Sequence, residues 1–299
     1  MKNIFISPLR IDFAGGWIDV PDFHKEIPGY VVNAAISPHI KKYKNGEVSF
    51  NPYKQGGGIS SSTGALILKK LSYLVPYSTN HHLYGTPQEI AEMIFHDENI
   101  MIKHRIGRQD QYAIALGGIN CLRFGHDGFH VHDFDVDIHI DKKTPAIRSL
   151  EKRLLLVHSG IKRPAQNIVE IVRDKVNSKK QKYLNALKDI AECGKRAAEA
   201  VRRENYEDLA EIMSQNWDAQ KRFVPECASP QINETYSAML NNGAYGGKMC
   251  GAGGGGYFVF YCQDAEKVKI EAKRRGLQVI EPKFEMKDIL ALNGLNPHD

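Results

Sequence analysis

Residues 55–64 read QGGGISSSTG, in which three consecutive glycines are followed by a cluster of hydroxyl side chains. An apolar run with helical spacing begins directly afterwards, at Ala65, Leu66, Ile67, Leu71 and Leu74. Glycines let a backbone approach a ligand closely, and a helix start presents free N–H groups and the positive end of the helix dipole. The stretch therefore predicts an anion site, with phosphate as the usual anion. A flexible Gly/Ser linker is the alternative.

The composition is that of a globular protein with one large domain or two ordinary ones. The chain has 299 residues, of which 42% are hydrophobic and 25% charged. No apolar run reaches the length of a membrane helix, and the start, MKNIFISPLRIDF, resembles a strand more than a secretion signal. The five cysteines are scattered without a CxxC pair, so we expect neither zinc nor disulfides, and a cytoplasmic location.

The formal net charge of +5 suits an anionic small molecule as ligand. The basic residues are mixed with acids along the expected helices, as in KRAAEAVRRENYEDLAE at residues 195–211. That mixture is typical of a solvated helix face. Since no basic stripe with interleaved aromatic residues is present, neither nucleic acid nor a membrane is an expected partner.

Residues 14–23, AGGWIDVPDF, contain the first candidates for a binding pocket. Gly15 and Gly16 mark a turn or a close approach to a ligand, and Asp19 follows them on a short loop. Arg10 lies on the strand-like run just before. Arg10 and Asp19 are therefore candidates for one pocket, although a surface ion pair and a turn-capping carboxylate are the ordinary explanations for them.

Two further carboxylates stand out in the middle of the chain. The sequence Thr86-Pro87-Gln88-Glu89 is a capping box that starts a helix running toward Glu98, where Glu98 is most simply a solvated side chain. Asp110 lies close to Arg105 and Arg108, which favour its ionised form. An ionised carboxylate there suits a group that orients or deprotonates a hydroxyl, and a loop salt bridge is the alternative.

Periodicity and turn residues predict an α+β order of elements along the chain. We expect strands at residues 4–6, 9–13 (separated by Ser7-Pro8), 31–36, 47–50, 118–124, 130–140, 154–157, 257–261 and 278–281. We expect helices after residues 64 and 86, after Pro164, twice within 179–219, at 229–241 and at 265–275. Residues 142–153 are charged, contain a proline and lack periodicity, so we place the domain boundary there, between domains 1–150 and 151–299.

Several familiar motifs are excluded. Gly251, Gly253 and Gly256 match GxGxxG, but a strand follows them where a dinucleotide fingerprint requires a helix. The His and Asp residues at 126–139 are explained by the polar face of a strand better than by a metal site. No GxxxxGK[ST] loop is present, so the chain lacks a Walker A motif.

Three stretches in order resemble the GHMP small-molecule kinases: PLRIDFAGGWID (8–19), GGGISSSTG (56–64) and KMCGAGGGGYF (248–258). The segments at 107–124 and 154–170 look like the branch that includes D-glycero-D-manno-heptose 7-phosphate kinases and L-fucokinases. The resemblance covers nearly the whole chain. It implies a two-domain α+β fold, with an N-terminal ribosomal-protein-S5-domain-2-like part and a C-terminal ferredoxin-like part.

The resemblance also implies how a nucleotide would be bound. ATP and Mg²⁺ are the expected cofactors. The residues expected to cradle the ATP phosphates are Gly56, Gly57, Gly58, Ser60, Ser61 and Ser62. Ser62 and Glu98 are the expected Mg²⁺ ligands.

The acceptor side follows from the same resemblance. Asp110 matches the carboxylate that deprotonates or orients the attacking hydroxyl, and Arg10 matches the residue that stabilises charge beside it. Phosphoryl transfer depends mainly on such positioning and charge neutralisation. Residues expected on the substrate side are Asp19, Gly15, Gly16, Gly253, Lys162 and Arg163. Lys162 and Arg163, with Arg105 or Arg108, are candidates to bind a phosphate already on the substrate.

The predicted function is therefore a kinase acting on a small-molecule sugar or sugar phosphate, most simply at the anomeric hydroxyl, with a homodimer left open. An L-fucose or related sugar kinase is the nearest alternative, and a non-catalytic sugar sensor on the same fold is the alternative of another class. The segment between Asp19 and Gly56 is shorter than in typical relatives. We expect the pocket for the nucleotide base to differ there.

Overall fold

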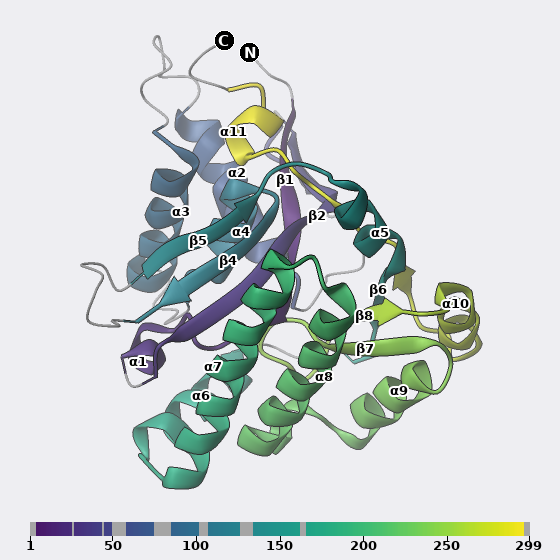
Figure 1. Cartoon of the computed structure of the whole chain (residues 1–299). Coiled ribbons are helices and arrows are strands. Elements are labelled where there is room, and N and C mark those ends of the chain that lie inside the picture. The colour runs from purple at the N-terminus through teal and green to yellow at the C-terminus, as the bar shows by residue number, and fades with distance from the viewer. Residues whose placement is uncertain are drawn as a thin grey trace.

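The chain folds into two antiparallel sheets with helices around and between them (Figure 1). The structure is a computed structural model that describes residues 4–25, 27–43, 45–49, 58–74, 85–101, 107–125, 134–161 and 166–295. One sheet is built mainly from the first half of the chain and the other from the second half. The described parts of the two candidate glycine motifs lie against one another.

The first sheet has six strands and is centred on the 15-residue strand β2. Its strands are β1 (Ile4–Ala14), β2 (Gly29–Tyr43), β3 (Val48–Ser49), β4 (Ile119–Phe124), β5 (Phe134–Ile140) and β10 (Lys283–Phe284). They follow the order β1-β2-β4-β5, while β3 and β10 pair with β2. Strand β5 alternates between half-buried apolar and exposed residues, which confirms the predicted half-buried strand within the described residues.

Contrary to our expectation, Ser7-Pro8 does not divide the first strand. Strand β1 continues through it, and the register against β2 shifts between Ser7 and Leu9. Because proline lacks the N–H that a ladder needs, a bulge is one of the few places where a strand accepts it. Beyond the bulge, alternation places Arg10 and Asp12 on one face of the strand, opposite the apolar residues that enter the core.

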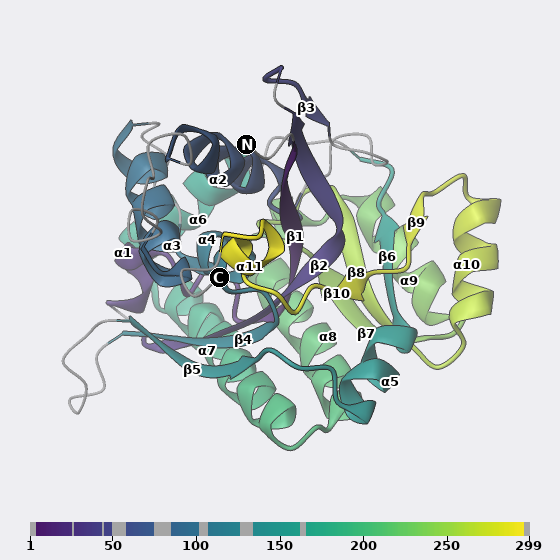
Figure 2. The ribbon, with the colours of Figure 1, turned by 90° about the horizontal axis from the view of Figure 1, so that it is seen from above.

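Helices cover both faces of the first sheet. Figure 2 shows α2 (Ser61–Leu74), α3 (Pro87–His96) and α4 (Gln109–Leu116) on one side, with α7 (Gln181–Arg202) and α8 (Tyr206–Phe223) on the other. The predicted capping box at Thr86 and Glu89 is confirmed, with both reciprocal hydrogen bonds present. A π-helical turn, η3 (Asp97–Met101), continues α3 and carries Glu98.

The second sheet has the ferredoxin-like arrangement that the resemblance implied. Its strands are β6 (Leu154–His158), β7 (Ala244–Met249), β8 (Tyr257–Cys262) and β9 (Val279–Ile280), in the order β7-β8-β6-β9. Along the chain, helices separate β6 from β7, a glycine-rich turn joins β7 to β8, and α10 (Ala265–Arg274) precedes β9. This is a β-α-β-β-α-β unit. Strand β7 was missed because AYGGKM offers glycines and a lysine in place of apolar alternation.

Residues 142–153, in which we found no periodicity and predicted no helix, contain a helix. Most of them form α5 (Pro145–Arg153), with Thr144 accepting a hydrogen bond from the backbone N–H of Ile147 at 3.1 Å. Ile147 and Leu150 are its buried face. The overlooked signal was a Thr-Pro start like that of α3. The domain boundary near residue 150 remains a prediction; the chain later returns to the first sheet through β10.

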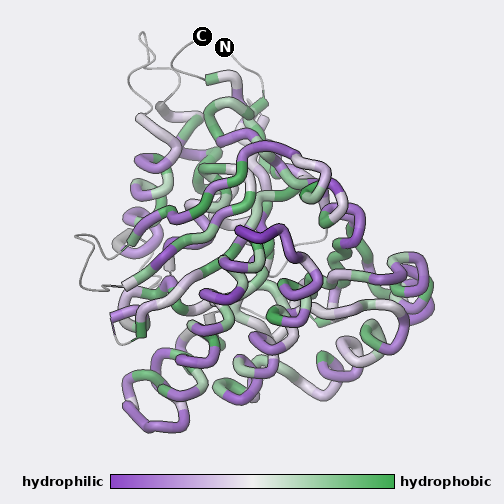
Figure 3. The backbone as a smooth tube through the Cα atoms, viewed as in Figure 1, coloured by the Kyte–Doolittle hydropathy of each residue, from purple (hydrophilic) through white to green (hydrophobic). Residues whose placement is uncertain are grey.

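The remaining described elements are shorter or peripheral. They are α1 (Pro21–His24), α6 (Gln166–Asn177), η4 (Pro225–Cys227), α9 (Pro230–Leu240) and α11 (Ile289–Leu292). Figure 3 shows hydrophobic residues concentrated along the strands and hydrophilic residues on the outer turns of the helices. All five cysteines are buried and free. Among the described residues, none of the helices has the length and apolar character needed to cross a membrane.

Candidate active site

Arg10 and Asp110, both predicted as catalytic residues, are in direct contact. The Nε of Arg10 donates to Oδ1 of Asp110 at 2.6 Å, and its Nη1 donates to the carbonyl oxygen of Gly58 at 2.8 Å. The Arg10 side chain is 4% exposed and that of Asp110 is 26% exposed. Although burial opposes it, the charges of Asp110 and Asp12 hold the pKa of Arg10 above its ordinary value. A permanent cation therefore fixes a carboxylate that solvent can still reach.

A buried ion pair behind Arg10 joins the two sheets. Asp12 on β1 accepts from Nη1 of Arg10 at 2.8 Å and from the ammonium group of Lys248 on β7, and both Asp12 and Lys248 are fully buried. The backbone N–H of Gly251 also donates to Asp12, at 2.8 Å. Burial alone would raise the pKa of Asp12, but Lys248 and Arg10 outweigh it and hold that pKa below its usual value. Two cations and two carboxylates thus form a network that is neutral as a whole.

Asp12 and Lys248 were not among the predicted site residues. Each is a charged residue inside a strand whose other members are mostly buried. Charges are almost never fully buried unless paired, so that placement was a usable signal. The pairing itself joins positions 236 residues apart, which periodicity does not predict.

The two glycine motifs lie against one another. A Cβ on Gly58 would lie 2.3 Å from the carbonyl oxygen of Cys250, and one on Gly251 would lie 2.9 Å from the Cα of Gly58. Gly58 has φ +81° and Gly251 has φ +70°, a region that favours glycine. The close approach requires glycine on both sides. The glycine-rich turn that contains Gly251 therefore packs directly against Gly58, at the end of the first glycine motif.

The start of α2 has features of an anion site. Ser60 immediately precedes the helix with φ +57°, and its buried Oγ has no hydrogen-bond partner among the described residues. The 14-residue helix begins at Ser61, so its first N–H groups are at this point. An orphaned hydroxyl beside a helix N-terminus fits the phosphates of a nucleotide. Ser62 is exposed, and Gly56 and Gly57 lie outside the described residues.

Glu98 is buried rather than solvated. Its carboxylate accepts hydrogen bonds from Oγ1 of Thr63 at 3.1 Å and from the side-chain amide of Gln111. Burial first, and then the charge of Asp110, raise the pKa of Glu98 to about 7. A carboxylate that ionises reluctantly beside another is suited to receiving a cation. Among the described hydroxyl residues of the predicted phosphate loop, Thr63 is the one that is hydrogen-bonded to Glu98.

The described residues contain no cluster of three or more His, Cys, Asp or Glu side chains that could hold a metal ion. A magnesium ion commonly has only one or two protein carboxylates as ligands, with phosphate oxygens and waters completing its shell. Glu98 on η3, which contacts Thr63 near the start of α2, fits that mode of binding when a nucleotide supplies the phosphates.

Asp19 lies beside the N-terminus of α4 and is buried. It accepts hydrogen bonds from the backbone N–H and the side-chain Nε2 of Gln109, each at 3.2 Å. Gly107 covers it so closely that a Cβ there would lie 1.8 Å from Oδ2 of Asp19. Burial first, and then the charge of Asp110, raise the pKa of Asp19 to about 7. The charge of Asp110 therefore acts on Asp19.

The glycines predicted on the substrate side have packing roles. Gly15 lies against β2 and α7, where a Cβ would come within 1.7 Å of the carbonyl oxygen of Tyr30. Gly16 lies beside Asp12, and a Cβ on Gly16 would lie 3.1 Å from Oδ2 of the Asp12 carboxylate. Gly253 has φ +85° and packs against Cys227. Of these three, Gly16 is the one placed directly against the ion network.

The basic residues predicted to bind a substrate phosphate are only partly described. Lys162, Arg163 and Arg105 lie outside the described residues. Arg108 is described, and it forms an ion pair with Glu92 on α3, with Nε and Oε1 2.8 Å apart. Its contacts thus differ from those of the Arg10 network.

Comparisons with known proteins find similarity to one class of kinases. Residues 197–276 match the family described as GHMP kinases C terminal. The D-glycero-alpha-D-manno-heptose 7-phosphate kinase of Campylobacter jejuni is 26% identical, over 88% of this chain and 90% of its own. The bifunctional fucokinase/GDP-fucose pyrophosphorylase of Arabidopsis thaliana is 23% identical over 88% of this chain, which corresponds to 30% of that longer protein.

Solved structures share the fold over nearly the whole chain. A D-glycero-D-manno-heptose 1-phosphate kinase from Bacteroides thetaiotaomicron matches with a TM-score of 0.66 and 17% identity, covering 96% of this chain and 97% of its own. The phosphomevalonate kinase of Streptococcus pneumoniae matches with a TM-score of 0.71 and 11% identity, covering 95% and 100%. The chain is therefore similar in sequence to kinases of the GHMP type, and it has the two-domain α+β fold expected of them.

Proposed function

We propose that this protein is an ATP-dependent kinase that transfers the γ-phosphoryl group to a hydroxyl of a sugar or sugar phosphate, at the anomeric position. Its sequence relatives include kinases named for a heptose 7-phosphate and for fucose. The observation that carries the proposal is the contact between Arg10 and Asp110 beside Gly58, because it puts a fixed carboxylate next to a phosphate-type loop.

In this proposal, Asp110 orients the acceptor hydroxyl and accepts its proton. Its partial exposure leaves room for the acceptor, and the 2.6 Å contact with Arg10 fixes its direction. Arg10 stabilises the negative charge that develops beside the acceptor oxygen. Asp12 and Lys248 hold Arg10 in place from behind and keep the buried network neutral.

The donor would lie along the glycine loop. Gly56, Gly57, Gly58, Ser60, Ser61 and Ser62 are proposed to hold the ATP phosphates. Glu98 and Ser62 are proposed to hold Mg²⁺, with Thr63 positioning the Glu98 carboxylate. When bound, Mg²⁺ would neutralise charge on the transferring phosphoryl group.

The acceptor would lie between Asp110 and Asp19. Asp19 is proposed to hold sugar hydroxyls, which requires displacement of its hydrogen bonds to Gln109 or sharing of them. The other residues proposed on this side are Gly15, Gly16, Gly253, Lys162 and Arg163. The proposed domains are residues 1–150, with the nucleotide and catalytic loops, and residues 151–299.

The test is ADP release with Mg²⁺-ATP and a panel of sugars and sugar phosphates, with ³¹P NMR to locate the new phosphate. We expect turnover with at least one aldose or aldose phosphate and a product phosphorylated at the anomeric carbon. A folded protein that binds ATP and releases no ADP with any member of the panel contradicts the proposal.

An unphosphorylated sugar such as L-fucose is the second candidate acceptor. It is favoured by the fucokinase relatives, which match 88% and 87% of this chain. Comparing kcat/KM for L-fucose and for a heptose 7-phosphate separates the two, because each candidate predicts a preference of at least tenfold in opposite directions.

A further inference from the structure

A hollow of about 450 Å³ lies between α1, α3 and β5, beside the candidate active site. It is lined by Pro21, His24, Lys25, Glu92, Phe95, Arg108 and Phe134. Volumes of this size are typical of pockets for small molecules. Pro21 lies two residues after Asp19 and Arg108 lies two residues before Asp110, so the hollow shares two chain segments with the candidate site.

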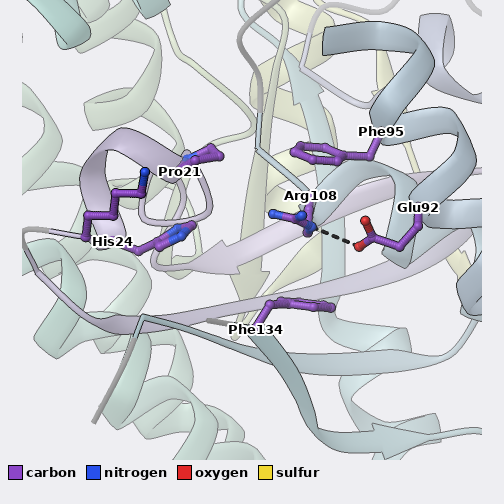
Figure 4. A pocket seen from close by; sticks show the side chains of 7 residues that line it. Pro21, His24, Glu92, Phe95, Arg108 and Phe134 are labelled. Atoms are coloured by element: carbon purple, nitrogen blue, oxygen red, sulfur yellow. Dashed lines mark hydrogen bonds and ion pairs between the residues drawn. The ribbon is translucent and has the colours of Figure 1, made fainter. Parts of the chain in front are cut away.

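Arg108 is held rigidly at one side of this hollow. Its guanidinium lies 4.0 Å from the ring centroid of Phe95 and 5.8 Å from that of Phe134, and Figure 4 shows it between the two rings. Its Nε donates to Glu92 at 2.8 Å, and Glu92 in turn accepts from the hydroxyl of Tyr112 at 2.9 Å. Aromatic faces and an anchored carboxylate thus fix the plane of the guanidinium.

The other edge of the guanidinium faces the hollow. In Figure 4 the side of Arg108 away from Glu92 points across the space toward His24 and Pro21. Lys25 also lines the hollow and is exposed. The hollow therefore brings together two permanent cations and a histidine, against one carboxylate that is already paired with Arg108.

We propose that this hollow is a binding site for a phosphate monoester group on a small molecule. A planar guanidinium with one edge held and the other presented to a cavity matches the bidentate geometry of phosphate oxygens. Lys25 supplies a second, mobile positive charge. The phosphate has two chemically equivalent sources, which are the distal phosphate of the acceptor sugar and a separate phosphorylated metabolite. The first source rests on the proposed function and the second is independent of it.

The test measures binding without nucleotide or turnover, so it does not depend on kinase activity. Isothermal titration gives Kd values for mannose 6-phosphate and for inorganic phosphate with the wild type, Arg108→Gln and Lys25→Gln. We expect a loss of about tenfold or more for Arg108→Gln, because a charged hydrogen-bonding partner is removed, and a smaller loss for Lys25→Gln. Lys273→Gln, an exposed change on α10, is the control for net charge.

The result that overturns the proposal is binding unchanged in both variants, or weakened equally in Lys273→Gln. Lys25→Gln changes only an exposed side chain, so it remains informative if Arg108→Gln does not fold. Competition separates the sources. If unphosphorylated mannose displaces mannose 6-phosphate, the sugar part occupies the acceptor site and the phosphate is that of the acceptor; if the two bind together, the hollow takes a separate metabolite.

Discussion

Replacing Lys248 by methionine is the change that the structure makes most consequential outside the predicted site residues. Methionine keeps an unbranched chain but removes the charge. Lys248 is fully buried, and its ammonium group bonds to Asp12 and to the carbonyl oxygen of Met249. The variant therefore leaves a buried carboxylate whose remaining charged partner is shared, since Arg10 also pairs with Asp110.

The expected cost follows from those contacts. Removing one partner of a buried ion pair costs about 3–5 kcal/mol in free energy of unfolding. Asp12 retains hydrogen bonds from Arg10 and from the backbone of Gly251, each at 2.8 Å, so we expect the lower end, about 3 kcal/mol. For a chain of this size that corresponds to a fall in Tm of roughly 5 °C.

Urea unfolding at pH 7 measures the loss, with Lys273→Met on the surface of α10 as the matched control. The double variant Lys248→Met/Asp12→Asn removes both charges, so it should be less destabilised than the two single changes combined, by about 1 kcal/mol or more. Stability within 0.5 kcal/mol of wild type in Lys248→Met, or strict additivity in the double variant, would refute the view that Lys248 neutralises Asp12.

Three further changes test the site. A proton competes with Mg²⁺ for Glu98, whose pKa is about 7, so the Mg²⁺ concentration that gives half-maximal activity in the wild type should decrease as the pH rises from 6 to 8. Glu98→Gln should raise that concentration about tenfold and remove its pH dependence. An unaltered Mg²⁺ titration in the variant opposes the role of Glu98. The folded pKa of Asp19, about 7, exceeds its ordinary value of 3.8, so wild-type stability falls as pH rises through this window. In urea unfolding, the free energy of unfolding of Asp19→Asn should therefore rise relative to that of the wild type as the pH increases from 4.5 to 8. A difference in free energy that stays constant over this pH range argues against the raised pKa. Gly58→Ala should cost about 1–3 kcal/mol and raise KM for ATP, because its Cβ would lie 2.3 Å from the Cys250 carbonyl; Gly46→Ala is the control, with similar φ and no atom within 4 Å, and equal Tm losses would contradict the steric argument.

The sequence was informative where a motif is local. The capped start of α3 and the strand β8 each depend on neighbouring residues, and the structure has them as predicted. The helix α5 had a local signal at Thr144-Pro145 that the charged composition of the segment obscured.

The remainder depends on tertiary contacts. Spacing placed Glu98 at the end of a helix, but its burial comes from Thr63 and Gln111 on two other helices. The pairing of Asp12 with Lys248 is equally non-local, because it requires β1 and β7 of different sheets to meet. Such pairs leave only a faint mark in the sequence, which is a charge within an apolar strand.

The most direct test of the central claim is the turnover of Asp110→Asn. Asparagine keeps the shape of the side chain but cannot accept the acceptor proton, so kcat should fall by about 10²–10⁴-fold while the affinity for ATP stays within twofold. Asp218→Asn, an exposed change on α8, should leave both unchanged. A kcat for Asp110→Asn within a few-fold of wild type, in a folded protein, would contradict the assignment of Asp110 as the group that activates the acceptor hydroxyl.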